Sequence, residues 1–123
     1  MDVRNINVLV LAFIGDSVYE DYVRHMLLSK GFPNVNDMQS ETIKYVSAKA
    51  QSEFLNRLIN DRFLTEEELD VVKRARNYKS SRHPKNIDII TYKWATGFEA
   101  LIGYLDVINN KERVIEIFNY IFG

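Results

Sequence analysis

The sequence contains no cysteine, and this absence removes several kinds of chemistry at once. Without cysteine the chain has no disulfides, no thiolate metal ligands and no cysteine nucleophile. A chain without disulfides suits a reducing compartment, so we expect a cytoplasmic location. No secretory signal is visible either, because the first apolar run, residues 8–14, follows a mixed-charge start and is followed by Gly15 and Asp16.

Long apolar runs, a large net charge and the common catalytic signatures are also missing. No stretch approaches the roughly 18 apolar residues of a membrane-spanning helix, so we expect no membrane segment. The formal net charge of −1 argues against binding nucleic acid through overall charge, but it is compatible with a local basic patch. The sequence has no Gly-rich phosphate loop, serine elbow or zinc-spaced histidine cluster. We interpret its two histidines, His25 and His83, as an exposed helix residue and a loop residue.

The sequence does contain enough apolar side chains for one folded core. Of its 123 residues, 46% are hydrophobic and 12% are aromatic, and this length fits a single domain over residues 1–123. Apolar residues recur at helical spacing and strand signals are nearly absent, which predicts a compact all-α domain of about five to seven helices. The expected helices cover residues 8–27, 37 or 40 to 59, 91–107 and 112–121, with a further helix starting at a capping box at Thr65 and a loop over 77–86.

Two carboxylates fall where core residues are expected. On a helical wheel, Asp16 lies on the apolar stripe of Leu9 and Tyr19, and Glu99 lies in a helix that is apolar nearly all round. A buried charge must be paired, hydrogen-bonded or bound to a metal. Two such carboxylates on separate helices can share Mg²⁺, which prefers oxygen ligands. Spacing alone equally allows each of them to pair with a basic side chain or to cap a helix.

Other acidic residues near these positions are open to two interpretations. Glu20 lies one turn after Asp16 and can join the same face, but it can also form an ordinary helix pair with Arg24. Asp106, two turns after Glu99, is ambiguous in the same way.

A local cationic segment follows an acidic one. Residues 66–70 include four acidic side chains, whereas residues 73–85 hold six basic and no acidic ones. Basic side chains with hydroxyl and amide donors nearby suit a phosphate backbone, and a solvated charged loop is the alternative. The candidates for phosphate contacts are Lys73, Arg74, Arg76, Lys79, Arg82 and Lys85.

The first expected helix is apolar around most of its circumference. Such a helix must be buried on several sides, and closed two-fold pairing is the commonest way to achieve this. The pattern therefore predicts a homodimer with an interface drawn partly from this helix. Its apolar residues are Val8, Leu9, Val10, Leu11, Phe13 and Ile14.

Four segments of the chain carry a family resemblance. They are residues 11–20 (LAFIGDSVYE), 44–51 (KYVSAKAQ), 74–80 (RARNYKS) followed by 84–86 (PKN), and 96–105 (TGFEALIGYL). In this order and at these spacings, they resemble the signature segments of the ribonuclease III family in its Mini-ribonuclease III form. The resemblance spans nearly the whole chain. It implies an all-α fold like the ribonuclease III endonuclease domain, a helical bundle that acts as a homodimer.

The resemblance also implies an activity and a site. The implied enzyme is a Mg²⁺-dependent endoribonuclease, with Mn²⁺ as a substitute, that cleaves double-stranded RNA to 5′-phosphate and 3′-hydroxyl ends. Asp16 and Glu99 match family acidic residues that hold the catalytic metal, and Glu20 is a candidate for the outer shell. Ala12 and Thr96 stand where full-length ribonuclease III has a glutamate and an aspartate, which looks like the Mini form and leaves the number of metal ions open.

The substrate implied by the resemblance is the precursor of large-subunit (23S) ribosomal RNA, with assistance by a ribosomal protein left open. The chain ends at Gly123, so we expect no separate RNA-binding domain and RNA contacts from the six basic residues. One alternative is a catalytically inactive ribonuclease III-fold protein that binds RNA or the ribosome, against which the retained Asp16 and Glu99 weigh. A second is a helical dimerisation module without RNA, against which the basic segment weighs.

Overall fold

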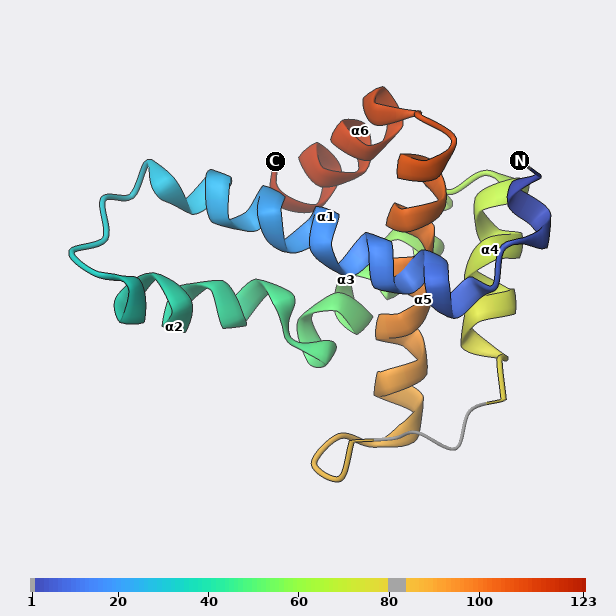
Figure 1. The fold of residues 1–123 in the computed structure, drawn as a ribbon, viewed down its shortest axis with the longest axis horizontal. Helices are drawn as coiled ribbons and strands as arrows, with labels where there is room; N and C mark the ends of the chain where they lie inside the picture. The colour runs from blue at the N-terminus through green and yellow to red at the C-terminus, as the bar shows by residue number, and fades with distance from the viewer. Residues whose placement is uncertain (1, 80–83) are drawn as a thin grey trace.

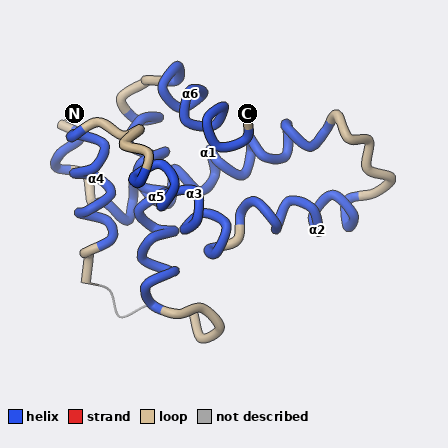
Figure 2. The backbone as a smooth tube through the Cα atoms, turned by 180° about the vertical axis from the view of Figure 1, so that it is seen from behind, coloured by secondary structure: helices blue, strands red, loops and turns tan. Residues whose placement is uncertain are grey.

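The protein is helical throughout the part of the chain that the structure describes. The computed structural model describes residues 2–79 and 84–123, so the predicted loop histidine His83 and the predicted phosphate contact Arg82 lie outside the described residues. Within those residues no strand occurs, which confirms the all-α prediction (Figure 2). The elements are η1 (Val3–Asn5), α1 (Val8–Leu28), α2 (Val35–Val46), α3 (Ala48–Asn60), α4 (Glu66–Arg76), α5 (Ile89–Val107) and α6 (Lys111–Phe122).

Most helix ends follow from capping side chains. The predicted capping box at Thr65 is present, since the Thr65 hydroxyl accepts from the Glu68 N–H at 3.1 Å and the Glu68 carboxylate accepts from the Thr65 N–H at 2.9 Å. The helix α5 starts two residues before the expected position because the side chain of Asp88 caps it by accepting from the Thr91 N–H.

The single helix expected up to residue 59 is wrong, because the chain breaks at Ser47. This residue has an extended backbone, with φ −62° and ψ 154°, and it separates α2 from α3. Its N–H still bonds to the Ile43 carbonyl, and its hydroxyl accepts from the Ala50 N–H at 3.2 Å. A serine side chain can thus end one helix and start the next without proline or glycine.

The helix α5 runs through the middle of the molecule. It packs against α1, α3, α4 and α6, and α1 crosses it near the centre of the molecule (Figure 1). The second half of α1 and the helix α2 form an antiparallel pair that projects to one side (Figure 1). None of the helices in residues 2–79 and 84–123 combines the length and the apolar character that crossing a bilayer requires.

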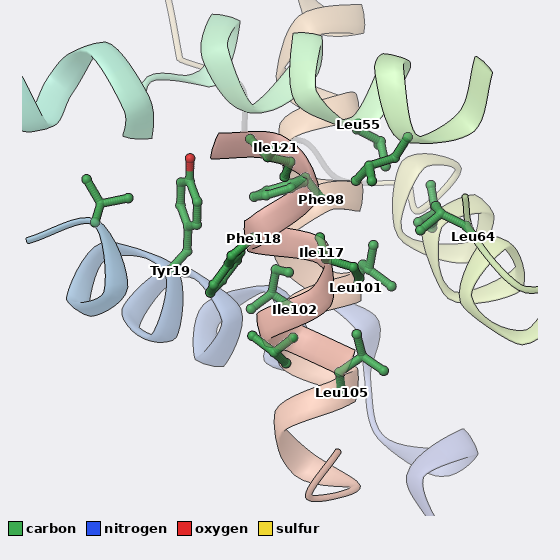
Figure 3. Packing of buried hydrophobic residues seen from close by; sticks show 14 of the residues in the cluster. Tyr19, Leu55, Leu64, Phe98, Leu101, Ile102, Leu105, Ile117, Phe118 and Ile121 are labelled. Atoms are coloured by element: carbon green, nitrogen blue, oxygen red, sulfur yellow. The ribbon is translucent and has the colours of Figure 1, made fainter. Parts of the chain in front are cut away.

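The core gathers around α5 and includes buried aromatic side chains from three helices. Tyr19 from α1 meets Phe98 from α5 edge to face with ring centroids 5.0 Å apart, and Phe118 from α6 packs beside them (Figure 3). The Tyr19 hydroxyl donates to the Tyr45 carbonyl at 2.8 Å, which ties α1 to the end of α2. Because Tyr19 lies three residues after Asp16 and Phe98 precedes Glu99, this packing fixes the helices that carry both carboxylates.

Two glycines allow α1 and α5 to approach with their backbones in contact. A Cβ atom on Gly15 would overlap the carbonyl oxygen of Glu99, and one on Gly103 would overlap the carbonyl oxygen of Leu11. Any side chain at either position would therefore push the two helices apart.

Candidate active site

The crossing of α1 and α5 brings Asp16 and Glu99 together. Asp16 directly follows Gly15, whose Cα packs on the backbone of Glu99, and the two carboxyl side chains lie within hydrogen-bonding distance. Both are partly buried, and both line an open hollow of about 360 Å³. The hollow is bounded by Leu9, Ala12, Phe13, Asp16, Tyr92, Thr96 and Glu99.

Burial and the neighbouring carboxylate strongly change the acidity of Glu99. Burial, followed by the hydrogen bond and the charge of Asp16, raises the pKa of Glu99 to about 9, whereas a hydrogen bond with Gln51 acts in the opposite direction. The negative charge of Glu20 also contributes to raising this pKa. Two carboxyl groups so close cannot both ionise unless a cation joins them, so without a cation Glu99 keeps its proton at neutral pH.

The two carboxylates provide a donor set that fits Mg²⁺ or Mn²⁺. In the part of the chain that the structure describes, neither Asp16 nor Glu99 forms an ion pair with a basic side chain, so the pairing alternative finds no support there. The same residues contain no group of three or more histidine or acidic side chains placed to hold a metal. Two protein oxygens facing an open hollow suit a small cation that keeps several of its waters.

Glu20 forms the helix pair that was one interpretation of its sequence position, and its place in the outer shell stays a prediction. Its carboxylate lies 3.4 Å from the Arg24 guanidinium, which is the ordinary helix pair. It is also close enough to Glu99 for its charge to raise the pKa of that residue, which places Glu20 at the edge of the site.

Asp106 and His25 lie elsewhere. Both line a separate hollow beside α6, together with Asp21. His25 is exposed, as expected, and its Nδ1 atom lies 3.5 Å from the Asp21 carboxylate. Asp106 therefore does not join the carboxylate pair.

The basic segment is less uniform than its sequence indicated. Lys73, Lys79 and Lys85 are exposed, whereas the Arg76 guanidinium lies over the Trp94 ring, 5.1 Å from its centroid. Arg74 lies among acidic residues of α4, with its Nε 3.4 Å from the Asp70 carboxylate. Arg74 is thus partly neutralised by the preceding acidic turn.

Tyr78 anchors the start of the loop between α4 and α5. Its hydroxyl accepts from the Asn7 side-chain amide at 3.2 Å, and Asn7 is also the N-cap of α1. The beginning of the basic segment is therefore attached to the helix that carries Asp16.

Sequence reasoning missed Gln51, which lies beside Glu99. This glutamine is buried, and its Nε2 donates to the Val46 carbonyl at 2.8 Å. The sequence pattern could have indicated this residue, because Gln51 shares a helix face with Leu55 and Leu58 just as Asp16 shares one with Tyr19.

Comparisons with known proteins agree on one family. The family model described as the ribonuclease III domain matches residues 9–107. A curated Streptococcus pneumoniae protein named Mini-ribonuclease 3 is 45% identical over 114 residues, covering 93% of this chain and 89% of that protein. A Brevibacillus brevis protein of the same name is 50% identical over 117 residues, covering 95% and 86% of the two chains. The crystal structure of a Fusobacterium nucleatum protein superposes with a TM-score of 0.88 at 33% identity, covering 99% of this chain and 98% of the other.

Proposed function

This chain belongs to the ribonuclease III domain family, among its Mini-ribonuclease 3 members, and we propose that it is a metal-dependent endoribonuclease that cleaves double-stranded RNA. The observation that carries the proposal is the meeting of Asp16 and Glu99 at a glycine-mediated helix crossing, beside an open hollow. We treat residues 1–123 as one catalytic domain, because α6, which lies beyond the matched region, packs into the same core.

The reaction is hydrolysis of a phosphodiester. The oxygen of a water forms a bond to phosphorus, the bond from phosphorus to the 3′-oxygen breaks, and the 3′-oxygen takes a proton. Held by Asp16 and Glu99, Mg²⁺ or Mn²⁺ would activate the attacking water and neutralise charge on the phosphoryl and leaving oxygens. Glu99 would give up its proton when the cation binds, and Glu20 adds negative charge at the edge of the site.

We propose that the RNA is gripped by the exposed basic residues. A-form duplexes are recognised mainly by shape, through phosphates and 2′-hydroxyls, so a few well-placed cations can suffice. Lys73, Lys79 and Lys85 are exposed and suited to this role, together with Arg76 beside Trp94. Arg82 belongs to the same proposed group, although it lies outside the described residues, and Arg74 is its weakest member because of Asp70.

The active form proposed is a homodimer. Phe13 lines the hollow beside Asp16 and is 80% exposed, and Val10 on the same helix is 49% exposed. Large apolar side chains so exposed beside a site are typical of a surface that a partner covers. A second copy across a two-fold axis would cover them and place two sites together.

The proposed substrate is the precursor of 23S ribosomal RNA. This extends the family resemblance, as do assistance by a ribosomal protein and the cytoplasmic location in which that RNA would be met. Mapping the ends of ribosomal RNA in cells that lack the protein tests the substrate, and unchanged mature ends would contradict it.

The activity is tested by incubating the protein with duplex RNA. We expect cleavage with Mg²⁺ or Mn²⁺, none with EDTA, and none with the Asp16→Asn variant. Asp21→Asn is the matched control, because Asp21 is an exposed aspartate of the same helix outside the hollow. Binding of duplex RNA by wild type without cleavage in either metal would instead support the inactive RNA-binding alternative.

A further inference from the structure

Gln51 is a buried amide at the back of the carboxylate pair. Only 2% of the residue is exposed, although glutamine is usually a surface residue. One N–H of its side chain donates to the Val46 carbonyl at 2.8 Å, and the side chain also hydrogen-bonds with that of Glu99. The side-chain oxygen, Oε1, is buried and has no hydrogen-bond partner.

The carbonyl contact fixes the orientation of this amide. Val46 is the last residue of α2, and the carbonyls of a final helical turn have no partner within their own helix. Because a carbonyl can only accept, the nitrogen of Gln51 must face Val46. The bond from the amide nitrogen to the Val46 carbonyl thus fixes the position of Oε1, which has no hydrogen bond of its own.

Packing alone does not require an amide at this position. The face of α3 around Gln51 is apolar, with Leu55 and Leu58 fully buried, so an apolar side chain of similar length would fill the same space. Such a side chain would leave the Val46 carbonyl without this donor, but the bond to Val46 does not explain the buried Oε1, whose unpaired state costs free energy. An orphaned acceptor next to a carboxylate pair is open to a donor that arrives with a ligand.

We propose that Gln51 is a positioning residue of the metal site, which orients Glu99 through its amide and accepts at Oε1 from a water ordered by the cation. The inference rests on the proposed metal-dependent function. A small divalent cation keeps several waters, and their hydrogens supply the donor that Oε1 lacks. Groups that hold a metal ligand from behind commonly set the affinity of the site.

The test is metal binding without RNA, using Mn²⁺ and following the paramagnetic signal of the free ion. Gln51→Met keeps the length of the side chain and removes the amide, and we expect it to weaken Mn²⁺ binding about 10- to 100-fold. Gln39→Met is the matched control, because Gln39 is exposed on α2, and it should bind as wild type does. Circular dichroism verifies that both variants are folded.

The cleavage kinetics separate positioning from a structural role. For Gln51→Met we expect the Mg²⁺ concentration at half-maximal rate to rise by the same factor, with kcat largely recovered at saturating Mg²⁺. If Gln51 only caps α2, its replacement by methionine should lower the thermal midpoint and leave the metal dependence unchanged. That result would overturn the inference.

The controls distinguish this inference from the proposed function. If wild type binds Mn²⁺, Asp16→Asn does not, and Gln51→Met matches wild type, the inference fails and the metal site stands. If wild type itself neither binds Mn²⁺ nor cleaves RNA, the proposed function fails. Should Gln51→Met not fold, NMR of the side-chain NH₂ groups of Gln51 and Gln39 in wild type provides the test. Saturating Mg²⁺ should shift the Gln51 signals alone, and unchanged signals would overturn the inference.

Discussion

Asp16 and Glu99 depend on one another because each lies in the electric field of the other. With no cation present Glu99 holds a proton, because burial first and the neighbouring Asp16 second raise its pKa. A divalent cation and this proton therefore compete for the same oxygens. We therefore expect the charge of the pair, more than its shape, to decide whether a metal binds.

Loss of either carboxylate should remove most of the activity. We expect Asp16→Asn and Glu99→Gln each to lower kcat/KM by roughly 10³-fold or more, because one amide already destroys the charge of the site. The double variant should be little worse than either single one, since both residues are proposed to hold one cation. Single-turnover assays on all three variants measure this. Additive losses would show that the residues act independently.

The pKa of Glu99 predicts an unusual pH dependence of stability without metal. Its pKa is about 9 in the folded chain against an ordinary 4.5, so the folded state binds the proton more tightly. The stabilisation from this proton is complete below pH 4.5 and is lost as pH rises towards 9. By pH 7 the loss amounts to about 3 kcal/mol.

Denaturant unfolding in EDTA between pH 5 and 9 checks this expectation. Wild type should lose stability relative to Glu99→Gln as pH rises, because glutamine cannot titrate. Saturating Mg²⁺ should reduce the difference in slope, since it binds the ionised pair. Parallel pH profiles in EDTA would mean that Glu99 has an ordinary pKa.

At the level of residues, buried carboxylates are easier to identify from the sequence than buried amides. Asp16 and Glu99 could be singled out because a carboxylate on an apolar face is costly enough to demand an explanation. Gln51 breaks the same pattern, but a neutral amide is less conspicuous. Arg74 could not be judged, because its pairing with Asp70 depends on which way α4 turns these side chains.

At the level of helices, periodicity predicts where elements lie and capping chemistry decides where they end. Four helices have bounds within two residues of expectation, because apolar spacing and caps such as Thr65 agree. Ser47 was missed because serine is tolerated within helices and the apolar pattern continues across it. The break matters for the site, since it leaves the Val46 carbonyl free to receive Gln51.

The glycine at the helix crossing should be irreplaceable. Gly15→Ala would place its Cβ on the backbone of Glu99, where no rotamer change can relieve the overlap. We expect a loss of about 3 kcal/mol or more in the free energy of unfolding, together with loss of cleavage. Thermal denaturation with parallel activity assays measures both.

Gly97→Ala provides the matched control for this prediction. Gly97 lies on α5 as well, but a Cβ there would meet Leu55 and Val72 at an ordinary 3.4 Å. We expect a much smaller change for this variant. Equal stabilities of the two alanine variants would contradict the tight crossing.

Charge is segregated across the whole molecule despite a net charge of only −1. The helix α4 begins with three glutamates and ends with three basic residues, an order that also suits the helix dipole. The cations thus gather at the end of α4 and in the loop that follows. The average charge of the chain conceals this surface.

Binding of duplex RNA should depend steeply on salt through the exposed lysines. Replacing Lys73, Lys79 and Lys85 with alanine should weaken binding, because fewer counterions are released. The slope of the logarithm of the binding constant against the logarithm of the salt concentration should fall in magnitude by up to about 3. Filter binding in Ca²⁺ across a salt series measures the slope. The charge-matched control replaces Lys30, Lys44 and Lys111, which are also exposed but lie outside the segment. Equal slopes in both variants would place the RNA elsewhere.

The exposed apolar face of α1 predicts a stable dimer. Sedimentation at micromolar concentration should give twice the 14.4 kDa mass of the chain. Val10→Asp with Phe13→Asp should yield monomers, since two charges cannot be buried against a second copy. Val35→Asp is the control, because Val35 is 81% exposed on α2. A monomeric wild type would contradict the dimer.

The glycine crossing of α1 and α5 also has a consequence for how such proteins diverge. Gly15 and Gly103 are needed for the helices to pack this closely, whereas the role that we propose for Asp16 and Glu99 is chemical. Selection on folding alone would therefore preserve the glycines and let the carboxylates drift. A descendant that abandoned cleavage for a scaffolding role should retain both glycines beside altered acidic positions. The two glycines would then record its ancestry, and the two carboxylates would report whether it is still an enzyme.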